Sequence, residues 1–195
     1  VRNDKELREI LADIRDDDIR ASEIIRRLRA LISNHATDFE ILDLNQVVRD
    51  TLEFVKIQAR ANSIAIHPSL ATGKLLVSAD SVQIQQVILN LAMNSIEAVN
   101  GSADGHRDIV LQTTSVRNNM IEFLISDSVP GVEIDKLTHI FEPFFTTKTN
   151  GMGIGLSLSR TIIEAHQGKI WVENGLHGGA VFRFRLPRAL PRQAN

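Results

Sequence analysis

"FFTTKTNGMGIGLSLSRTIIEAH", residues 144–166, is the stretch that decides the fold. It places three alternating glycines, Gly151, Gly153 and Gly155, directly before an apolar helix predicted over residues 154–166. Glycine lets backbone N–H groups approach oxygens closely, and a helix N-terminus adds free N–H donors and partial positive charge. The segment therefore predicts a mobile phosphate-binding loop, although its spacing matches neither G-x-G-x-x-G nor G-x-x-x-x-G-K-[ST].

The composition is that of an ordinary globular protein, since 43% of the 195 residues are hydrophobic and 24% are charged. A formal net charge of −2 gives no global field that attracts nucleic acid or an acidic membrane, so we expect neither partner. The lack of cysteine excludes disulfides and thiolate metal sites and favours a reducing, cytoplasmic location. No apolar run approaches the roughly 20 residues of a membrane span. The sequence begins without methionine, and we expect a fragment of a longer protein, which can itself be membrane-anchored.

Residues 4–33 predict one long helix whose apolar residues follow alternating spacings of four and three, as in a coiled coil or helical hairpin. One apolar stripe needs a partner helix to bury it. The alternative is an ordinary amphipathic helix packed on the following domain. The periodicity stops at residues 34–45, which we expect to be a connector, and residues 188–195 are expected to be a tail.

Helical and strand patterns alternate between these segments, over residues 46–187. The predicted helices span 46–61, 81–99 and 133–141, and the predicted strands span 63–67, 74–78, 108–117, 120–127, 169–174 and 179–186. Asn118-Asn119 and Gly178-Gly179 indicate turns between consecutive strands. The strands cluster late in the sequence with helices on one side, so we expect an α+β domain.

Two asparagines stand out within the predicted helix 81–99. Asn90 and Asn94 are four residues apart and share one helical face. Asparagine is a mediocre helix former, and its side-chain carbonyl is a hard oxygen ligand suited to Mg²⁺. The pair predicts a metal or phosphate site, the alternative being an unremarkable surface feature.

Two further polar side chains adjoin predicted turns. Asp127 ends an apolar strand and is followed at once by Pro130-Gly131. A carboxylate held there can accept a hydrogen bond from an exocyclic amine, while the alternative is a simple turn aspartate. Lys148 precedes the glycines and can reach a phosphate, although an exposed lysine is the simpler interpretation.

Taken in this order, the features resemble the ATP-binding domain of sensor histidine kinases, whose GHKL or Bergerat fold is shared with gyrase, Hsp90 and MutL. The resemblance covers roughly residues 42–187, and residues 142–170 are similar to the oxygen-sensor and nitrogen-regulation branch of two-component kinases. It implies a two-layer α/β sandwich with a mixed sheet and helices on one face. Residues 1–33 look like the second helix of that family's dimerisation hairpin, which implies a homodimer in the full-length protein.

The resemblance also implies ATP and Mg²⁺ as cofactors and assigns their contacts. The implied nucleotide-binding residues are Asn90, Asn94, Asp127, Gly131, Lys148, Gly151, Gly153 and Gly155. Among them Asn94 is the implied Mg²⁺ ligand, Asp127 recognises adenine and Gly131 shapes the adjacent turn. The glycines of residues 151–155 form the lid, and Lys148 is a candidate phosphate contact.

Two positions depart from the family pattern. Val129 replaces the first glycine of Asp-x-Gly-x-Gly, where a β-branched residue at positive φ is costly. Ala180 replaces a common threonine and removes a hydroxyl near adenine. We therefore expect weakened or altered nucleotide binding. The phosphoacceptor of the family lies on the first hairpin helix, and none of the six histidines has that context, so we expect no catalytic residue here: His35, His67, His106, His139, His166 and His177.

The sequence thus predicts the ATP-binding catalytic portion of an ATP-dependent protein-histidine kinase. Such a kinase passes the γ-phosphoryl group to a histidine outside this fragment and then to an aspartate of a response regulator. One alternative is a degenerate GHKL module with a regulatory, non-catalytic role. Another is an ATPase of the gyrase or MutL type, although Asn90 stands where those enzymes typically have a general-base glutamate.

Overall fold

The computed structural model describes residues 38–102, 107–148, 151–176 and 178–189. Its elements in chain order are β1 (Glu40–Asp43), α2 (Leu44–Ala61), β2 (Ala65–Ser69), β3 (Leu76–Ala79), α3 (Ser81–Gly101), β4 (Asp108–Val116), β5 (Met120–Asp127), α4 (Gly155–Ala165), β6 (Lys169–Asn174) and β7 (Ala180–Pro187). The helix predicted over 4–33 and the tail beyond Ala189 lie outside the described residues.

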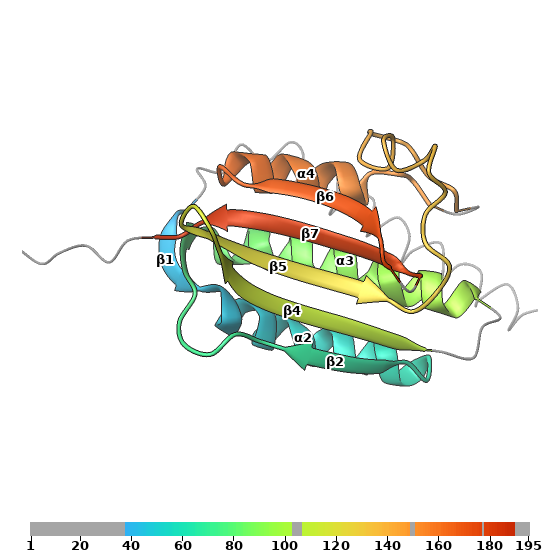
Figure 1. Ribbon diagram of the computed structural model, residues 1–195, viewed down its shortest axis with the longest axis horizontal. Helices are drawn as coiled ribbons and strands as arrows, with labels where there is room; N and C mark the ends of the chain where they lie inside the picture. The colour runs from blue at the N-terminus through green and yellow to red at the C-terminus, as the bar shows by residue number, and fades with distance from the viewer. Residues whose placement is uncertain (1–37, 103–106, 149–150, 177, 190–195) are drawn as a thin grey trace, which may run out of the picture. The chain divides into compact units, whose positions relative to one another are not determined.

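A five-stranded sheet of order β2-β4-β5-β7-β6 forms one layer of the described domain. β2 pairs with β4 in parallel, and every other pair in this sheet is antiparallel. The three helices cover one face of the sheet, with α3 between α2 and α4 (Figure 1). This confirms the predicted α+β class and two-layer sandwich with a mixed sheet. β1 and β3 form a separate two-stranded sheet.

The core lies between the sheet and the helices. Phe123 of β5 and Phe184 of β7 are both fully buried, and their rings stack with centroids 5.0 Å apart. On the helical side, α3 buries an apolar stripe of Ile84, Val87, Ile88, Leu91, Ala92, Ile96 and Val99. Burial of such side chains contributes most of the favourable free energy of folding, and here it fixes the position of α3 against the sheet.

Local sequence signals explain how several elements begin and turn. Asp43 and Asp80 are the N-caps of α2 and α3, each accepting a backbone N–H from two or three residues ahead. Asn118 and Asn119, at φ of 62° and 55°, form the tight turn between β4 and β5. The hairpin predicted from this Asn-Asn pair is confirmed.

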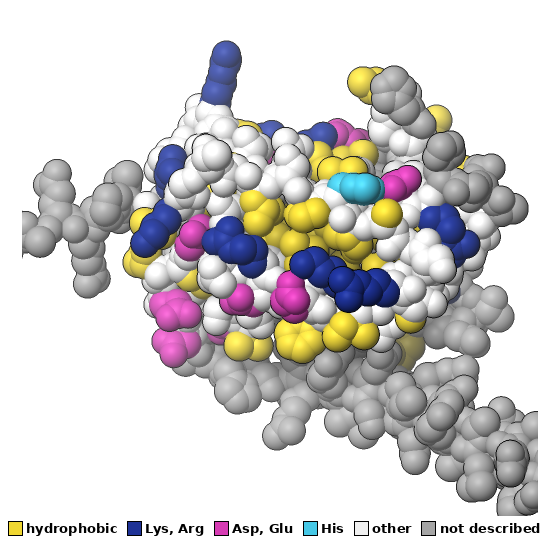
Figure 2. All heavy atoms as spheres, turned by 90° about the horizontal axis from the view of Figure 1, so that it is seen from below, with side chains coloured by type: hydrophobic (Ala, Val, Ile, Leu, Met, Phe, Trp, Pro, Cys, Tyr) yellow, Lys and Arg dark blue, Asp and Glu magenta, His cyan; other side chains and the backbone are white. Residues whose placement is uncertain are grey.

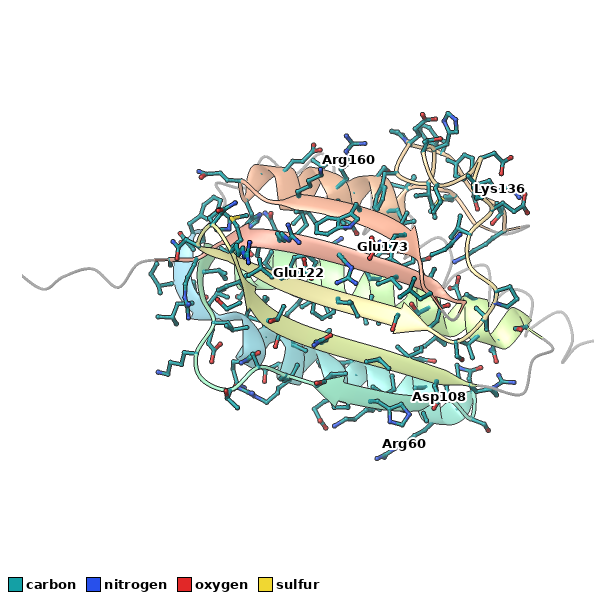
Figure 3. The ribbon with its side chains drawn as sticks, viewed as in Figure 1. Arg60, Asp108, Glu122, Lys136, Arg160 and Glu173 are labelled. Atoms are coloured by element: carbon teal, nitrogen blue, oxygen red, sulfur yellow. The ribbon has the colours of Figure 1, made fainter. Side chains whose placement is uncertain are left out.

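The face of the sheet away from the helices holds a charged network. Glu122 of β5 is 5% exposed and accepts hydrogen bonds from Arg183 at 2.9 Å and from Arg185 at 2.6 Å. Arg183 also donates to Glu173 of β6 at 2.7 Å, and Figure 3 shows Glu122 and Glu173 on this uncovered face. The network neutralises a buried carboxylate.

His166 joins three parts of the domain where α4 ends. Its Nε2 accepts the backbone N–H of Asp80 at 3.0 Å, so its Nδ1 carries the proton and donates to the carbonyl of Ile162 at 2.7 Å. Its ring lies 4.8 Å from that of Phe39. His166 is therefore a capping and packing residue of α4.

Two features differ from the sequence prediction. Residues 40–43 form β1 and α2 begins at Leu44, within the stretch 34–45 predicted as a connector. Four residues were too few to show a strand period, but pairing with β3 organises them. The short helix predicted over 133–141 is wrong, because this segment folds into successive turns such as His139 N–H to Lys136 C=O.

The edge of the domain formed by α2 and β2 exposes side chains of mixed character. Phe54 and Ile57 of α2 are 68% and 65% exposed, and Lys56 pairs with Glu53 beside them. Figure 2, which views this side, shows hydrophobic side chains bordered by lysine and arginine. Among the described residues, no helix has the length and apolar character needed to cross a membrane.

Candidate functional site

Asn90 fastens α3 to the first turn of α4. Its Nδ2 donates to Ser159 Oγ at 2.9 Å, and Ser159 Oγ in turn donates to the carbonyl of Gly155 at 3.0 Å. A Cβ added to Gly155 would lie 2.5 Å from Asn90 Oδ1. The third glycine of the alternating set is therefore required because the Asn90 amide lies directly against the helix start.

Asn94, one turn further along α3, meets the segment that precedes the glycines. Lys148 Nζ donates to Asn94 Oδ1 at 2.8 Å and also forms an ion pair with Glu97. The oxygen predicted to bind Mg²⁺ thus already has a cationic partner in Lys148. Glu97 adds a carboxylate within reach of the same ammonium group, so this part of the site stabilises positive charge.

Asp127 is a buried carboxylate with one oxygen committed and one free. Asp127 is 7% exposed, and its Oδ1 accepts a hydrogen bond from the backbone N–H of Ala180 at 3.0 Å. Oδ2 is buried without a hydrogen-bond partner among the described residues. Burial raises the pKa of this carboxyl above its usual value, opposed by the backbone N–H groups of Ala180 and Val129 and by the Ser95 hydroxyl. A buried acceptor without a partner is suited to an incoming N–H donor.

The loop after Asp127 is held by a side chain from β6. Asn174 accepts the Val132 N–H on Oδ1 at 2.8 Å and donates from Nδ2 to the Val132 carbonyl at 2.7 Å. A Cβ on Gly131 would lie 2.2 Å from Asn174 Oδ1, so glycine permits this close approach. Val129 is buried at 5% exposure and does not have positive φ, so the backbone cost expected for it does not arise.

The glycine segment forms a tight loop against Phe144. Gly153 has φ of +66°, its carbonyl accepts the Phe144 N–H at 2.9 Å, and a Cβ there would lie 2.4 Å from the Phe144 carbonyl carbon. A Cβ added to Gly151 would also be too close, at 2.6 Å from Thr146 Oγ1. α4 then begins at Gly155 without a side-chain cap, so its first N–H groups stay available to an anion.

Successive positions on α3 therefore meet each candidate element. Asn90 contacts the start of α4, Asn94 binds Lys148, and the Ser95 hydroxyl lowers the pKa of Asp127 against the effect of burial. Asp127 and Gly131 are in turn linked through the backbone of residues 179–180. These contacts bring Asn90 to Gly155, Asn94 to Lys148 and Asp127 to Gly131. Gly151 and Gly153, the other two residues predicted from the sequence, contact the chain at residues 144–148 instead.

Four residues of this arrangement were not predicted: Ser95, Glu97, Ser159 and Asn174. Glu97 is three residues after Asn94, a helical interval that could have indicated it, whereas Ser95 is at no such interval from either asparagine. Ser159 sits four residues after Gly155, again a helical interval. No local signal indicated Asn174, because its partner Val132 is 42 residues away.

The side-chain oxygens of Asn94 and Glu97 suit a hard cation such as Mg²⁺ whose remaining ligands are phosphates and waters. Among the described residues, no group of three or more His, Cys, Asp or Glu side chains is placed to hold a metal. Mg²⁺ usually takes one or two protein oxygens and completes its shell with phosphates and waters. Asn94 Oδ1, beside Glu97, is a donor of that kind.

Gly155→Ala is expected to weaken nucleotide binding about tenfold with little change in stability. The new methyl group displaces the Asn90 amide, while alanine is favoured over glycine in a helix by about 0.5–1 kcal/mol, which offsets the lost contact. Titration calorimetry and thermal melts measure the two effects. Gly101→Ala is the matched control, because an added Cβ there meets nothing within 4 Å; equal affinity in both variants would contradict the role of Gly155.

Asn174→Ala is expected to lower the free energy of unfolding by about 1 kcal/mol, since two partly solvated hydrogen bonds are lost. It should also speed hydrogen exchange at the Val132 amide, which amide exchange with mass spectrometry measures. Asn174→Asp keeps the Oδ1 acceptor and should retain part of the protection. Unchanged exchange in Asn174→Ala would show that the loop does not depend on this side chain.

Comparison with known proteins places this geometry in a family. Residues 79–190 match the model described as histidine kinase-, DNA gyrase B-, and HSP90-like ATPase. The chain belongs to this ATPase family. The match includes α3, Asp127 and α4 and so contains every candidate contact above.

Relatives within the family are sensor kinases. The chain is 42% identical over 171 residues to the sensor protein FixL of Bradyrhizobium diazoefficiens, covering 88% of this chain and 34% of that protein. It is 36% identical over 186 residues to the sensor histidine kinase TmoS of Ectopseudomonas mendocina, covering 95% of this chain and 19% of that protein. The chain thus spans about a third or less of the length of these relatives.

A solved structure has the same fold. The catalytic domain of histidine kinase ThkA, in a nucleotide-free form, superposes with a TM-score of 0.69 at 35% identity, covering 77% of this chain and 96% of that one. ThkA in complex with the response regulator protein TrrA superposes with a TM-score of 0.74 at 29% identity, covering 90% of this chain and 49% of the ThkA chain. The GHKL assignment made from the sequence is therefore confirmed.

Proposed function

We propose that this chain is the Mg²⁺-ATP-binding part of a two-component sensor histidine kinase. In this proposal the γ-phosphoryl group passes to a histidine outside the 195 residues and then to an aspartate of a response regulator. The observation that carries the proposal is the pair of contacts along α3, where residues 90 and 94 meet the start of α4 and Lys148 respectively.

Each residue then has a chemical role. Asp127 Oδ2 accepts the exocyclic amine of the adenine, while Ala180 holds Oδ1 and so fixes the carboxylate plane. The free N–H groups at the start of α4 and the glycine segment bind phosphate oxygens. Asn94 Oδ1 would hold Mg²⁺, which when bound neutralises phosphate charge. Lys148 must release this oxygen first, and its ammonium group then becomes available to a phosphate.

Partners and location follow from the same proposal. Because ThkA, a structural relative, has been solved with its response regulator, we infer a response regulator as the downstream partner. The apolar seam of residues 4–33 favours a homodimer of the full-length protein through a helical hairpin. A cytoplasmic location fits the lack of cysteine.

Phosphotransfer in trans tests the proposal. The 195-residue chain is mixed with Mg²⁺, radiolabelled ATP and a separate dimerisation hairpin that bears a phosphoacceptor histidine. Acid-labile, base-stable label on the hairpin supports the kinase assignment. ATP binding without transfer would favour the regulatory module, and steady release of phosphate without labelling would favour an ATPase of the gyrase type.

A further inference from the structure

Glu97 continues the line of polar side chains along α3. Asn90, Asn94 and Glu97 are separated by four and three residues, so they share one face of the helix. The carboxylate of Glu97 is half exposed and pairs with the ammonium group of Lys148. Glu97 therefore contacts the residue that we expect to reach a phosphate.

The ion pair between Glu97 and Lys148 joins two parts of the domain. Among the described residues, it is the only ion pair that links α3 to the segment between β5 and α4. The other two ion pairs of that segment lie within it, and they join Lys136 to Glu133 and His139 to Glu142. The position of the Lys148 ammonium group thus depends on α3 and not on its own segment.

The backbone of Lys148 is held in a turn beside the glycines. Its N–H donates to Thr146 Oγ1 at 3.1 Å, and its carbonyl accepts the N–H of Gly151 at 3.2 Å. A Cβ added to Gly151 would lie 3.0 Å from Lys148 Cβ, so the glycine packs closely against the lysine stem. Because the backbone is held, the conformation of the flexible four-carbon stem decides where the ammonium group lies.

Two oxygens of α3 fix that conformation. The ammonium group has three N–H donors, of which one donates to Asn94 Oδ1 at 2.8 Å and another to Glu97 Oε2. When Asn94 Oδ1 is given to a metal, the bond to Glu97 still holds the ammonium group beside α3. Two N–H donors of Lys148 are then available to phosphate oxygens.

We propose that Glu97 is a positioning residue that acts through Lys148 and keeps its ammonium group directed at the phosphates of ATP. A lysine side chain free in solvent loses rotamer entropy when it binds a phosphate, and the bond to Glu97 means that this cost is already met. A carboxylate that acted on the phosphates directly would repel them, so the two roles predict effects of opposite sign. This inference rests on the proposed function, because it requires phosphates beside Lys148.

A double-mutant cycle tests whether Glu97 acts through Lys148. The wild-type chain, Glu97→Gln, Lys148→Met and the double variant are each titrated with Mg²⁺-ATP by calorimetry, and thermal melts are recorded without nucleotide. Glu53→Gln is the matched control, because Glu53 forms an exposed ion pair with Lys56 at 2.9 Å on another helix, α2.

The expected result is a loss of affinity that depends on the lysine. Glu97→Gln should raise the Kd for ATP about threefold, as for the loss of a partly exposed ion pair. Lys148→Met should raise it about tenfold, as for the loss of a charged hydrogen bond. The double variant should bind no more weakly than Lys148→Met, and Glu53→Gln should bind as the wild type does. The Tm of every variant should stay close to that of the wild type, since exposed ion pairs contribute little stability.

Two outcomes would overturn the inference while leaving the proposed function intact. If Glu97→Gln bound ATP as tightly as the wild type or more tightly, the carboxylate would not direct Lys148 to the phosphates. If the double variant lost a further threefold relative to Lys148→Met, Glu97 would act independently of Lys148, as a metal ligand would. A wild-type chain that does not bind Mg²⁺-ATP would instead refute the proposed function, and this inference with it.

Discussion

Asp127→Asn is expected to lower ATP affinity about 100-fold, the cost of losing a hydrogen bond to a charged acceptor and replacing it with a repulsive contact. Ala180 N–H is bound by Oδ1 at 3.0 Å, so the asparagine carbonyl will stay there and its Nδ2 will occupy the place of Oδ2. Two N–H donors then face each other at the adenine amine. Calorimetric titration with Mg²⁺-ATP measures the loss.

The same variant is expected to stabilise the chain without nucleotide. Burial raises the pKa of Asp127, so the folded chain binds this proton more readily than the unfolded chain. The free energy of unfolding therefore falls as pH rises from the usual carboxyl pKa through the raised one. Asp127→Asn removes this slope, and its Tm at pH 7 should equal or exceed that of the wild type. A lower Tm together with weak binding would indicate simple misfolding.

Asn94→Ala is the second large effect, expected to reduce phosphotransfer to the separate hairpin at least roughly 100-fold, since metal charge stabilisation is worth several kcal/mol. The side-chain oxygen of Asn94, the proposed metal ligand, here accepts a hydrogen bond from Lys148. Without it, Glu97 and Lys148 still pair with each other, so the fold should persist. The rate of label transfer at saturating ATP, measured over a range of Mg²⁺ concentrations, gives the effect.

Asn100→Ala provides the comparison for this variant. Asn100 lies on the same helix, but its side chain bonds to Asn62 and Arg107 instead of Lys148. Its phosphotransfer rate should match that of the wild type. If Asn94→Ala retained more than a tenth of the wild-type rate, the assignment of Asn94 as the metal ligand would be wrong.

The fold was largely predictable because its signals are local. The 3.6-residue period of α3, the Asn118-Asn119 turn and the glycine before α4 each depend on residues adjacent in sequence. The segment over 133–141 was mispredicted as a helix because its i to i+3 turns share the same spacing of polar and apolar residues. β1 escaped detection because four residues become a strand only through β3.

The candidate site was predictable in its residues but not in its contacts. Asn90, Asn94 and Asp127 are chemically conspicuous in sequence, whereas their partners are set by tertiary packing. Lys148 was expected to reach a phosphate, yet it is bound to Asn94, 54 residues earlier. Such distant pairings depend on how α3 packs against the sheet, which no local pattern encodes.

The packing of Phe39 on His166 couples the backbone before β1 to the C-terminal end of α4. Phe39 precedes β1, and it lies against the last turn of α4, an 11-residue helix that spans about 16 Å and starts at Gly155. A helix of this length moves as a rigid body. A displacement of the backbone ahead of Phe39 would therefore act on the C-terminal end of α4, while the glycine segment adjoins its N-terminal end.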